Sequence, residues 1–530
     1  MYTSIYKEEE NMKKSKATRM LALLMGMLLV LSMAACGNKT KVDDKGTDSK
    51  STEVKSSEAQ SVPESTQEEP KEIVEIKVIA PIGYGMEDTQ KVVDALNVLL
   101  EEKIGVRVDL EALSFSDYDG VVNMKYASGE EFDVIWACDW TNDIVAAVNN
   151  EVVMEISDAI TKYCPKLYDT MPESYWELSK INGGLYAVPN MQSATASPGL
   201  VVQKELADKY GLYPEKVKSV SDMEDFWDAL VENEKDIWSI RAGLATDCIK
   251  EGFSFYGTST VISYDLDDMY NTDKWEVKPI WELDGWVDQV YKIHEWYEKG
   301  YIRSDVASVM SDAEDVKAGK YATFSYGWTP GADVTVSTAY GKEYYAIRTG
   351  TAVVGTATPM SAMWAISANS EKVKAALDFI YLLHTDKEVL NMLTYGIEGE
   401  HYTWVDEDHI RLAEGVDMKF KNDAWVTGDV YLAYLLEGND EDVKEQQKAY
   451  GETLPTDPLA GFLFNSENVK TQVAQLATVW SEFANMRSKG TVDVDTELPK
   501  FIERMKGAGV EDVVKEVDRQ LQEFLANKKK

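Results

Sequence analysis

The stretch FDVIWA, residues 132–137, is an almost continuous apolar run of the length of one strand. A strand with one face in water alternates apolar and polar residues, whereas a strand covered on both faces is apolar almost throughout. The run therefore predicts a strand that is buried on both faces. Such strands belong mainly to parallel sheets.

The residues before this run alternate between strand and helix patterns. In IVEIKVIAP (73–81) and VRVDLEAL (106–113) the apolar residues occupy every second position, which predicts two more strands. Between them a helix is expected to begin at about Thr89 and to stop at Gly105, and a second helix over 121–127 leads into the apolar run. The order strand, helix, strand, helix, strand predicts an α/β fold with a parallel sheet built by right-handed crossovers.

The remainder of the chain alternates less regularly. Residues 200–202 predict a strand that leads into a helix over 204–210, and Ser221 is expected to cap the helix that follows. Asp386 is expected to cap another short helix. From about Asn465 onward the spacing of apolar residues predicts an almost entirely helical C-terminus.

The N-terminus carries a targeting pattern. Four basic residues between positions 13 and 19 precede an apolar stretch over 20–33, and the small residues Ala34 and Ala35 stand before Cys36. A basic start, a short apolar segment and small residues at a cleavage site are typical of a secretory signal. The apolar stretch is too short for an ordinary membrane-spanning helix.

The segment LSMAAC, residues 31–36, resembles a bacterial lipoprotein box. The resemblance implies that residues 1–35 are removed as a signal peptide and that Cys36 becomes the first mature residue and carries the lipid. A secretory signal without lipidation is the alternative. Residues 36–70 are poor in aromatic residues and rich in Lys, Asp, Glu, Ser and Thr, which predicts a disordered tether between the lipid and the folded body.

Length, charge and composition narrow the possible functions. The chain has 530 residues, which suits two or more lobes, and its formal net charge is −38. Because an acidic surface repels phosphate groups, no binding to nucleic acid is expected. With four histidines and no calcium-loop pattern in the acidic run 265–268, neither a metal nor a cofactor is expected.

Three cysteines remain besides Cys36. Cys138, Cys164 and Cys248 are an odd number and lack the spacing of a metal site. Cys138 follows the apolar strand pattern directly, which favours a buried thiol. One disulfide among the three stays possible.

Four short motifs occur in an order similar to that of the family 1 extracellular solute-binding proteins, and the agreement extends over most of residues 73–530. They are SGEEFDVIW (128–136), NGGLYAVP (182–189), AGKYA continuing to Trp328 (318–328) and WAIS (364–367). A fifth segment, YGIEGEHY (395–402), resembles a subgroup of large lipoprotein receptors from Gram-positive bacteria.

The resemblance implies a fold, a location and a role. Members of the family are receptors of ABC importers, many of them for sugars, and have an α/β, two-lobed periplasmic-binding-protein type II-like fold with the ligand cleft between the lobes. Lobe 1 is then expected to comprise residues 73–190 plus 356–435, and lobe 2 residues 191–355 plus 436–530. The family's role implies an extracellular monomer, lipid-anchored at the outer face of the cytoplasmic membrane. Lobe closure would capture a small polar solute, a sugar or oligosaccharide, for the permease subunits of an ABC transporter.

Carbohydrate binding requires aromatic faces for the C–H surfaces of sugar rings and fixed polar groups for the hydroxyls. Asp139 and Trp140 directly follow the apolar strand, whose end points into the cleft by the family pattern. Trp328 stands where related sugar receptors place a stacking tryptophan. The candidate ligand-binding residues are Tyr84, Trp136, Asp139, Trp140, Ser193, Tyr326, Trp328, Trp364, Glu398 and Tyr402.

Several of these candidates also have a structural alternative. Trp136 and Trp328 are as typical of packing within a lobe, and Trp364 of packing at the hinge. Asp139 is also typical of a helix N-cap. Glu398 and Tyr402 are also typical of a salt-bridged loop.

Two other functions share these sequence features. A cell-surface glycosidase needs two carboxylates beside the scissile bond, and the many acidic residues do not decide for or against it. The order of the motifs argues against an enzyme, as does the absence of G-x-S-x-G, HExxH and P-loop patterns. A ligand receptor for a membrane sensor kinase would have the same fold and cleft.

Overall fold

The computed structural model describes residues 73–83, 85–192, 196–256, 259–309, 311–414 and 418–528. The signal peptide, Cys36 and the tether lie outside the described residues, as do Tyr84 and Ser193. Two main sheets organise the described chain, and we call the parts built on them lobe 1 and lobe 2. The residue limits given above for the lobes stay a prediction.

The sheet of lobe 1 has the strand order β2-β1-β3-β12-β4. Its strands are β1 (Val74–Pro81), β2 (Val106–Leu113), β3 (Val134–Ala137), β4 (Ala187–Pro189) and β12 (Met363–Ile366). β1 pairs in parallel with both β2 and β3, and every residue of β3 is buried, so both predictions from the apolar run are confirmed. β12 returns from much later in the chain and joins the sheet antiparallel to β3 and β4.

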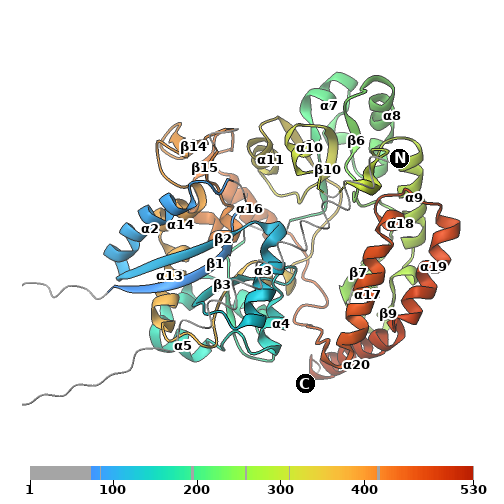
Figure 1. Ribbon diagram of the computed structural model, residues 1–530. Helices are drawn as coiled ribbons and strands as arrows, with labels where there is room; N and C mark the ends of the chain where they lie inside the picture. The colour runs from blue at the N-terminus through green and yellow to red at the C-terminus, as the bar shows by residue number, and fades with distance from the viewer. Residues whose placement is uncertain are drawn as a thin grey trace, which may run out of the picture. The chain divides into compact units, whose positions relative to one another are not determined.

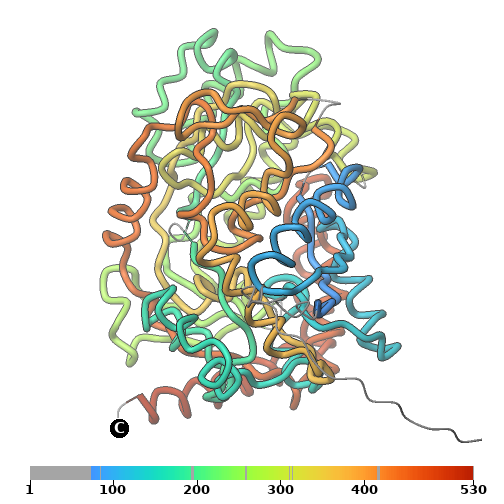
Figure 2. The backbone as a smooth tube through the Cα atoms, turned by 90° about the vertical axis from the view of Figure 1, so that its left-hand side faces the viewer, coloured from blue at the N-terminus to red at the C-terminus, as the bar shows by residue number. Residues whose placement is uncertain are grey.

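Helices cover this sheet where the sequence predicted them. α2 (Thr89–Ile104) ends at Gly105, whose φ of 68° is the left-handed conformation that favours glycine. α14 (Lys387–Tyr395) begins at Asp386, whose carboxylate accepts hydrogen bonds from two backbone N–H groups of the first turn, both at 3.1 Å. α2 and α14 lie side by side although almost 300 positions separate their starts, as Figures 1 and 2 show in blue and orange.

The sheet of lobe 2 has the order β11-β5-β10-β6. It contains β5 (Gly199–Gln203), β6 (Trp238–Ile240), β10 (Tyr321–Ser325) and β11 (Tyr344–Arg348). β5 is antiparallel to its neighbours β10 and β11, whereas β6 is parallel to β10. The helix predicted over 204–210 is α7.

The cap predicted at Ser221 is wrong. Helix α8 (Glu224–Asn233) begins one turn later, after a 3₁₀ turn over Val220–Met223. At that turn Asp222 accepts a hydrogen bond from the backbone N–H of Ser219 at 2.9 Å. The Ser221 hydroxyl instead donates a hydrogen bond to Asp247 at 2.8 Å. It therefore binds a distant side chain and not the backbone N–H groups at the start of the helix.

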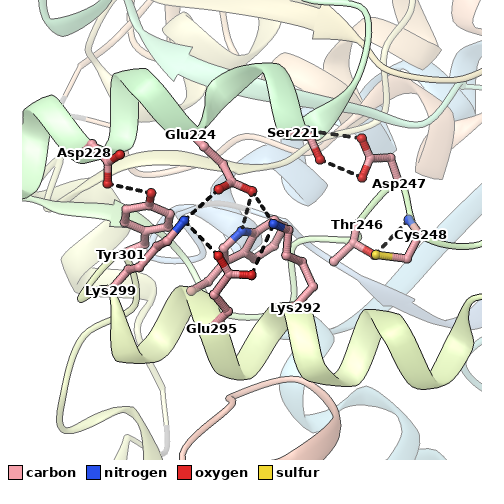
Figure 3. Close-up of polar contacts among 11 residues, drawn as sticks. Ser221, Glu224, Asp228, Thr246, Asp247, Cys248, Lys292, Glu295, Lys299 and Tyr301 are labelled. Atoms are coloured by element: carbon pink, nitrogen blue, oxygen red, sulfur yellow. Dashed lines mark hydrogen bonds and ion pairs between the residues drawn. The ribbon is translucent and has the colours of Figure 1, made fainter.

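An ionic cluster joins α8 to α9 (Trp286–Glu298), as Figure 3 shows. The Glu224 carboxylate pairs with Lys292 at 2.7 Å and with Lys299 at 2.9 Å. It also accepts a hydrogen bond from the Trp296 indole at 3.3 Å. The Trp296 ring packs edge-on against Trp227 of α8, so the polar cluster lies directly beside an aromatic core.

The helical C-terminus is confirmed. It consists of α17 (Lys470–Glu482), α18 (Ala484–Arg487), α19 (Val494–Gly507) and α20 (Val510–Lys528). α20 packs on a small antiparallel sheet of lobe 2, and Figure 1 shows the helices in red beside it. The strands of that sheet are β7 (Gly252–Tyr256), β8 (Thr260–Tyr264) and β9 (Glu276–Pro279).

A second small sheet extends lobe 1 and shares a hydrophobic cluster with α14. Its strands are β13 (Tyr402–Trp404), β14 (His409–Leu412) and β15 (Leu435–Leu436). Two short helices near it matter for the site, α15 (Ala424–Thr427) and α16 (Val443–Glu452). The remaining helices are α3 (Phe115–Ser128), α4 (Ile144–Asn149), α5 (Ser157–Tyr163), α6 (Glu173–Leu178), α10 (Ala313–Lys317), α11 (Ala332–Tyr340), α12 (Ala357–Met360) and α13 (Val373–Thr385).

The chain passes between the two main sheets three times, within residues 190–198, 349–362 and 437–469. The thiols of Cys138, Cys164 and Cys248 are all free, so these three form no disulfide with one another. In the described ranges no helix combines the length and apolar character needed to cross a bilayer. The same ranges hold no group of three or more His, Cys, Asp or Glu residues arranged to bind a metal.

Candidate ligand-binding site

A cavity of about 590 Å³ lies between lobe 1, lobe 2 and the segments that cross between them. The residues just after β10 form the wall on lobe 2. The segment that leads into α15, with the start of α15 itself, forms the wall on lobe 1, and α16 forms a third wall. Residues that represent these walls are Tyr326, Thr329, Lys421, Asp423, Trp425 and Gln447. Its size is that of an ordinary small-molecule site.

Tyr326, a candidate from the sequence, directly follows strand β10 and forms the lobe 2 wall of the cavity. Burial raises the pKa of the Tyr326 hydroxyl, and the negative charge of Asp423 from lobe 1 raises it further. The phenol therefore stays protonated at neutral pH and keeps an O–H donor beside the cavity.

The lobe 1 wall is held in place by polar contacts. Asn422 accepts a hydrogen bond from Gly83 N–H and donates one to Pro81 C=O, both at 3.2 Å, which ties the wall to the end of β1. The Lys421 ammonium pairs with Asp423 at 2.6 Å. Two opposite charges and the adjoining Trp425 ring thus face one cavity.

Trp136 and Trp364 lie in the core beneath this wall. Their exposed fractions are 0% and 1%. The Trp136 indole donates to Val426 C=O at 3.1 Å, and the Trp364 indole donates to Thr427 C=O at 2.9 Å. Both rings therefore hold the α15 turn that carries Trp425, and neither ring lines the cavity.

Trp140 lies at the edge of the cavity, and Asp139 directly precedes it in the chain. Trp140 is exposed, and its indole donates at 2.9 Å to the carbonyl of Ser361, which lines the cavity. Crowding by protein atoms and the nearby Asp143 raise the pKa of the Asp139 carboxyl to about 6. Asp139 is not the cap of α4, because Asp143 accepts the hydrogen bonds from Val145 and Ala146 N–H.

Trp328 is half-buried beside the cavity and does not line it, although its neighbours on both sides do. Its ring meets Tyr450 of α16 edge-on with centroids 5.2 Å apart. The Arg348 guanidinium lies 5.4 Å from the Trp328 ring centroid. In this structure the ring therefore packs α16 onto lobe 2.

Neither Glu398 nor Tyr402 lines the cavity. Glu398 is exposed and pairs through its backbone with Tyr402. Tyr402 is buried against Tyr434 and Trp404. Glu400 forms an ion pair with Lys91, so this loop has the salt-bridged character that was its structural alternative.

Tyr84 and Ser193 lie outside the described residues. Gln192 and Ala196, the described residues before and after positions 193–195, both line the cavity. The roles of Tyr84, Ser193 and the other candidates as ligand-binding residues stay predictions.

Several cavity residues were missed in the sequence. Tyr395 and Tyr434 contribute two aromatic rings, stacked with centroids 6.4 Å apart. Trp425 stands in a short segment, KNDAWVTGD (421–429), that has neither strand nor helix periodicity. Its mixture of charges, an aromatic residue and a glycine is typical of a binding loop and was the signal available.

Helix α16 contacts both lobes. On the lobe 1 side the Lys444 ammonium donates to the carbonyls of Tyr431, at 3.0 Å, and Ala433. On the lobe 2 side the Gln447 amide donates to Pro330 C=O at 2.9 Å. Burial lowers the pKa of Lys444 to about 8. Both side chains line the cavity, so α16 is a wall that connects the lobes.

Comparisons with known proteins agree with this architecture. Residues 458–526 match a domain of unknown function, DUF3502. A carbohydrate ABC transporter substrate-binding protein of Streptococcus pneumoniae is 25% identical over 511 residues, covering 94% of this chain and 97% of that protein.

Solved structures of one protein extend the similarity to three dimensions. The N-glycan transport solute binding protein NgtS of S. pneumoniae is 25% identical with a TM-score of 0.73, covering 86% of this chain and all of that one. Its complex with Man5GlcNAc is 26% identical with a TM-score of 0.72, covering 86% and 99%. The two-lobed fold and a relative matched over nearly its whole length are consistent with the resemblance of this chain to the family 1 extracellular solute-binding proteins, and the chain is similar to solute-binding proteins of carbohydrate ABC transporters.

Proposed function

We propose that this chain is an extracytoplasmic substrate-binding lipoprotein that captures a sugar or oligosaccharide and delivers it to the permeases of an ABC importer. The observation that carries the proposal is the cavity of about 590 Å³ to which both lobes and the crossing helix α16 contribute. A ligand held there touches all three parts at once.

The chemistry of the walls favours a carbohydrate. Sugar rings present apolar C–H faces, for which the rings of Tyr326, Tyr395 and Trp425 offer flat partners. Sugar hydroxyls both donate and accept hydrogen bonds, and Asp423 and Gln447 supply an acceptor and an amide. The names of the relatives, one a carbohydrate receptor and one an N-glycan receptor, support the same class.

Binding is coupled to closure in this proposal. A ligand that contacts both lobes binds more tightly to the conformer in which the lobes approach each other, so it shifts the population toward that conformer. The permeases would then recognise the closed conformer. Lipidation at Cys36 would hold the receptor near them through the tether of residues 36–70.

The test is calorimetric titration of the purified protein with a panel of neutral mono- and oligosaccharides, followed by recovery of the sugar. We expect at least one saccharide to bind and to be recovered intact. Trp425→Ala and Tyr326→Ala, from opposite walls, should each weaken binding about tenfold by removing a stacking face. Tyr213→Ala, an exposed ring away from the cavity, should leave the affinity unchanged.

Other results of the same test would favour other functions. Recovery of cleaved sugar would support the glycosidase. Binding without uptake, in cells that retain the permeases, would support a receptor for a sensor kinase. Failure of every saccharide to bind would remove carbohydrate as the ligand class.

A further inference from the structure

Trp140 exposes an unusually large share of an indole ring. Its exposed fraction is 55%, although it directly follows the buried strand β3. The ring is held in one orientation because its indole N–H donates to Ser361 C=O at 2.9 Å. The Phe115 ring, at the start of α3, stacks against it with centroids 5.8 Å apart and planes 25° apart. A large apolar face is therefore both exposed and fixed.

This face is continuous with the cavity wall. Phe115 also stacks against Trp425, with centroids 5.9 Å apart and planes 20° apart. Trp140 and Trp425 themselves are 6.2 Å apart. Because Trp425 and Ser361 line the cavity, the three rings lead from the cavity to the protein surface. We call Phe115, Trp140 and Trp425 the aromatic shelf.

The core supports the shelf from beneath. The buried Trp136 ring meets all three shelf rings edge-on or nearly so, at centroid distances of 5.9–6.1 Å. Trp136 is itself fixed by its hydrogen bond to α15. The shelf rings thus lose little conformational freedom on binding a ligand, which favours affinity.

We propose that the aromatic shelf is an outer subsite that stacks a pyranose ring projecting from the cavity, so that the ligand is an oligosaccharide longer than the cavity holds. The inference rests on the proposed function, since it requires a carbohydrate in the cavity. Continuity of the shelf with the cavity wall favours the projecting part of that ligand over an unrelated protein partner as the occupant. The Asp139 carboxylate, one position before Trp140, offers an acceptor for hydroxyls of the stacked ring.

The test compares long and short saccharides on the same variants. Probes are matched pairs from the saccharide panel, beginning with Man5GlcNAc and the shorter Man1GlcNAc. Trp140→Ala should weaken binding of the longer probe about tenfold, from the loss of one stacking face, and change the shorter one less than twofold. Trp140→Phe should restore most of the affinity for the longer probe because it keeps an apolar ring. Tyr213→Ala, also 55% exposed, is the matched control and should change neither.

Each outcome bears on one of the two claims. If no saccharide of any length binds the unaltered protein, the proposed function fails and the subsite fails with it. If saccharides bind, equal losses for long and short probes overturn the subsite, because Trp140 then only supports the cavity wall. Unchanged binding of both probes also overturns it, and loss of uptake in that case would make the shelf a docking surface for another protein. A single cooperative thermal unfolding transition of Trp140→Ala, at a melting temperature only a few degrees below that of the unaltered protein, confirms that the variant is folded.

Discussion

His384 is a buried histidine without a polar partner. Its exposed fraction is 3%, and within the described chain neither ring nitrogen has a hydrogen-bond partner. Burial lowers the pKa of His384 from 6.5 to about 4, because the charged imidazolium is poorly tolerated in an apolar site. The imidazole is therefore neutral at pH 7. Its buried position on helix α13 favours this neutral form over the charged one.

A depressed histidine pKa makes the protein sensitive to acid. The unfolded chain takes up a proton near pH 6.5 and the folded chain only near pH 4, so stability falls as the pH drops through this range. The full loss is about 3 kcal/mol, at 1.36 kcal/mol per pKa unit. His384→Leu should abolish this part of the pH dependence, measured as melting temperature between pH 7.5 and 4.5. A variant with the same slope as the unaltered protein would contradict this role for His384.

His409 is a control for His384, because its pKa is shifted in the opposite direction and its effect on stability has the opposite pH dependence. The Asp406 carboxylate, with a smaller opposing effect of burial, raises the pKa of His409 above its ordinary value. Its contribution to stability is present at low pH and is lost as the pH rises through the raised value. His409→Gln should therefore destabilise the protein at acidic pH and have little effect at alkaline pH.

At the scale of single residues, the sequence predicted the kind of side chain that lines the cavity better than it predicted which residues lie there. Its candidates include Tyr326, which lines the cavity, and Trp140, which lies at the cavity edge and was recognisable because it follows the apolar strand. It could not separate Trp425, which lines the cavity, from Trp136 and Trp364, which are buried below it. Tryptophan suits both a core and a sugar site, and only the tertiary fold decides which face of the α15 turn each ring meets.

At the scale of elements, Glu224 secures the packing of α8 on α9 (Figure 3). Burial disfavours its charge, but hydrogen bonds from Lys292, Lys299 and the Trp296 indole outweigh burial and lower the pKa of Glu224. Glu224→Gln should reduce the free energy of unfolding by about 1–2 kcal/mol at pH 7. Because the folded pKa is depressed, the difference should shrink as the pH falls below the ordinary value of 4.5.

Glu295 provides a matched control within the same cluster. It pairs with the same two lysines but is 47% exposed, against 19% for Glu224. Solvent weakens exposed ion pairs, so Glu295→Gln should change the free energy of unfolding by less than about 0.5 kcal/mol. Chemical denaturation of both variants at pH 7 and pH 4 is the measurement. Equal effects of the two substitutions would show that burial of Glu224 is not what matters.

Elements were predictable where local signals determine them. α2, α7 and α14 begin or end at residues whose chemistry caps a helix. A glycine in the left-handed conformation follows α2 and α7, and an aspartate that accepts backbone hydrogen bonds precedes α14. α16 was not predicted, because Val443 is its only buried residue and it has no apolar stripe. Its position depends on polar contacts of Lys444, Gln447 and Tyr450 with two lobes, which no local pattern encodes.

On the scale of the whole molecule, Ser197 links the three segments that cross between the lobes. It is 1% exposed and lies in the first crossing segment. Its hydroxyl accepts a hydrogen bond from Ala352 N–H of the second segment at 2.9 Å and bonds to the hydroxyl of Tyr450 in the third. Ser197 is therefore placed to limit the relative motion of the lobes.

Removing this link should weaken ligand binding without any direct contact to the ligand. Ser197→Ala and Tyr450→Phe each release the crossing segments and enlarge the set of conformers that cannot bind, so each should raise the Kd about two- to tenfold. The double variant should be no worse than Ser197→Ala alone, because Ser197→Ala already removes the bond to Tyr450 together with the bond to Ala352. Titration calorimetry with a saccharide that binds in the panel test measures the Kd of all three variants, and additive losses would contradict the shared link.

A hydroxyl elsewhere in lobe 2 supplies the control. Tyr297 donates to Ser304 C=O at 3.1 Å, away from the crossing segments. Tyr297→Phe removes a tyrosine hydroxyl as Tyr450→Phe does, and it should leave the Kd unchanged. A similar loss in this variant would indicate general loosening of lobe 2.

The last prediction concerns the attachment of the whole receptor to the membrane. With a cleavable secretory signal in place of residues 1–35, the protein with Cys36 replaced by Ser should be secreted and recovered in the soluble fraction. The natural N-terminus should direct the unaltered protein to the membrane fraction, because buried acyl chains contribute about 0.8 kcal/mol per CH₂ group. Cys248→Ser, which changes a free and partly exposed thiol of the folded body, should stay with the membrane. Retention of the Cys36 variant would mean that the folded body itself binds the membrane, which its net charge of −38 opposes for anionic lipid.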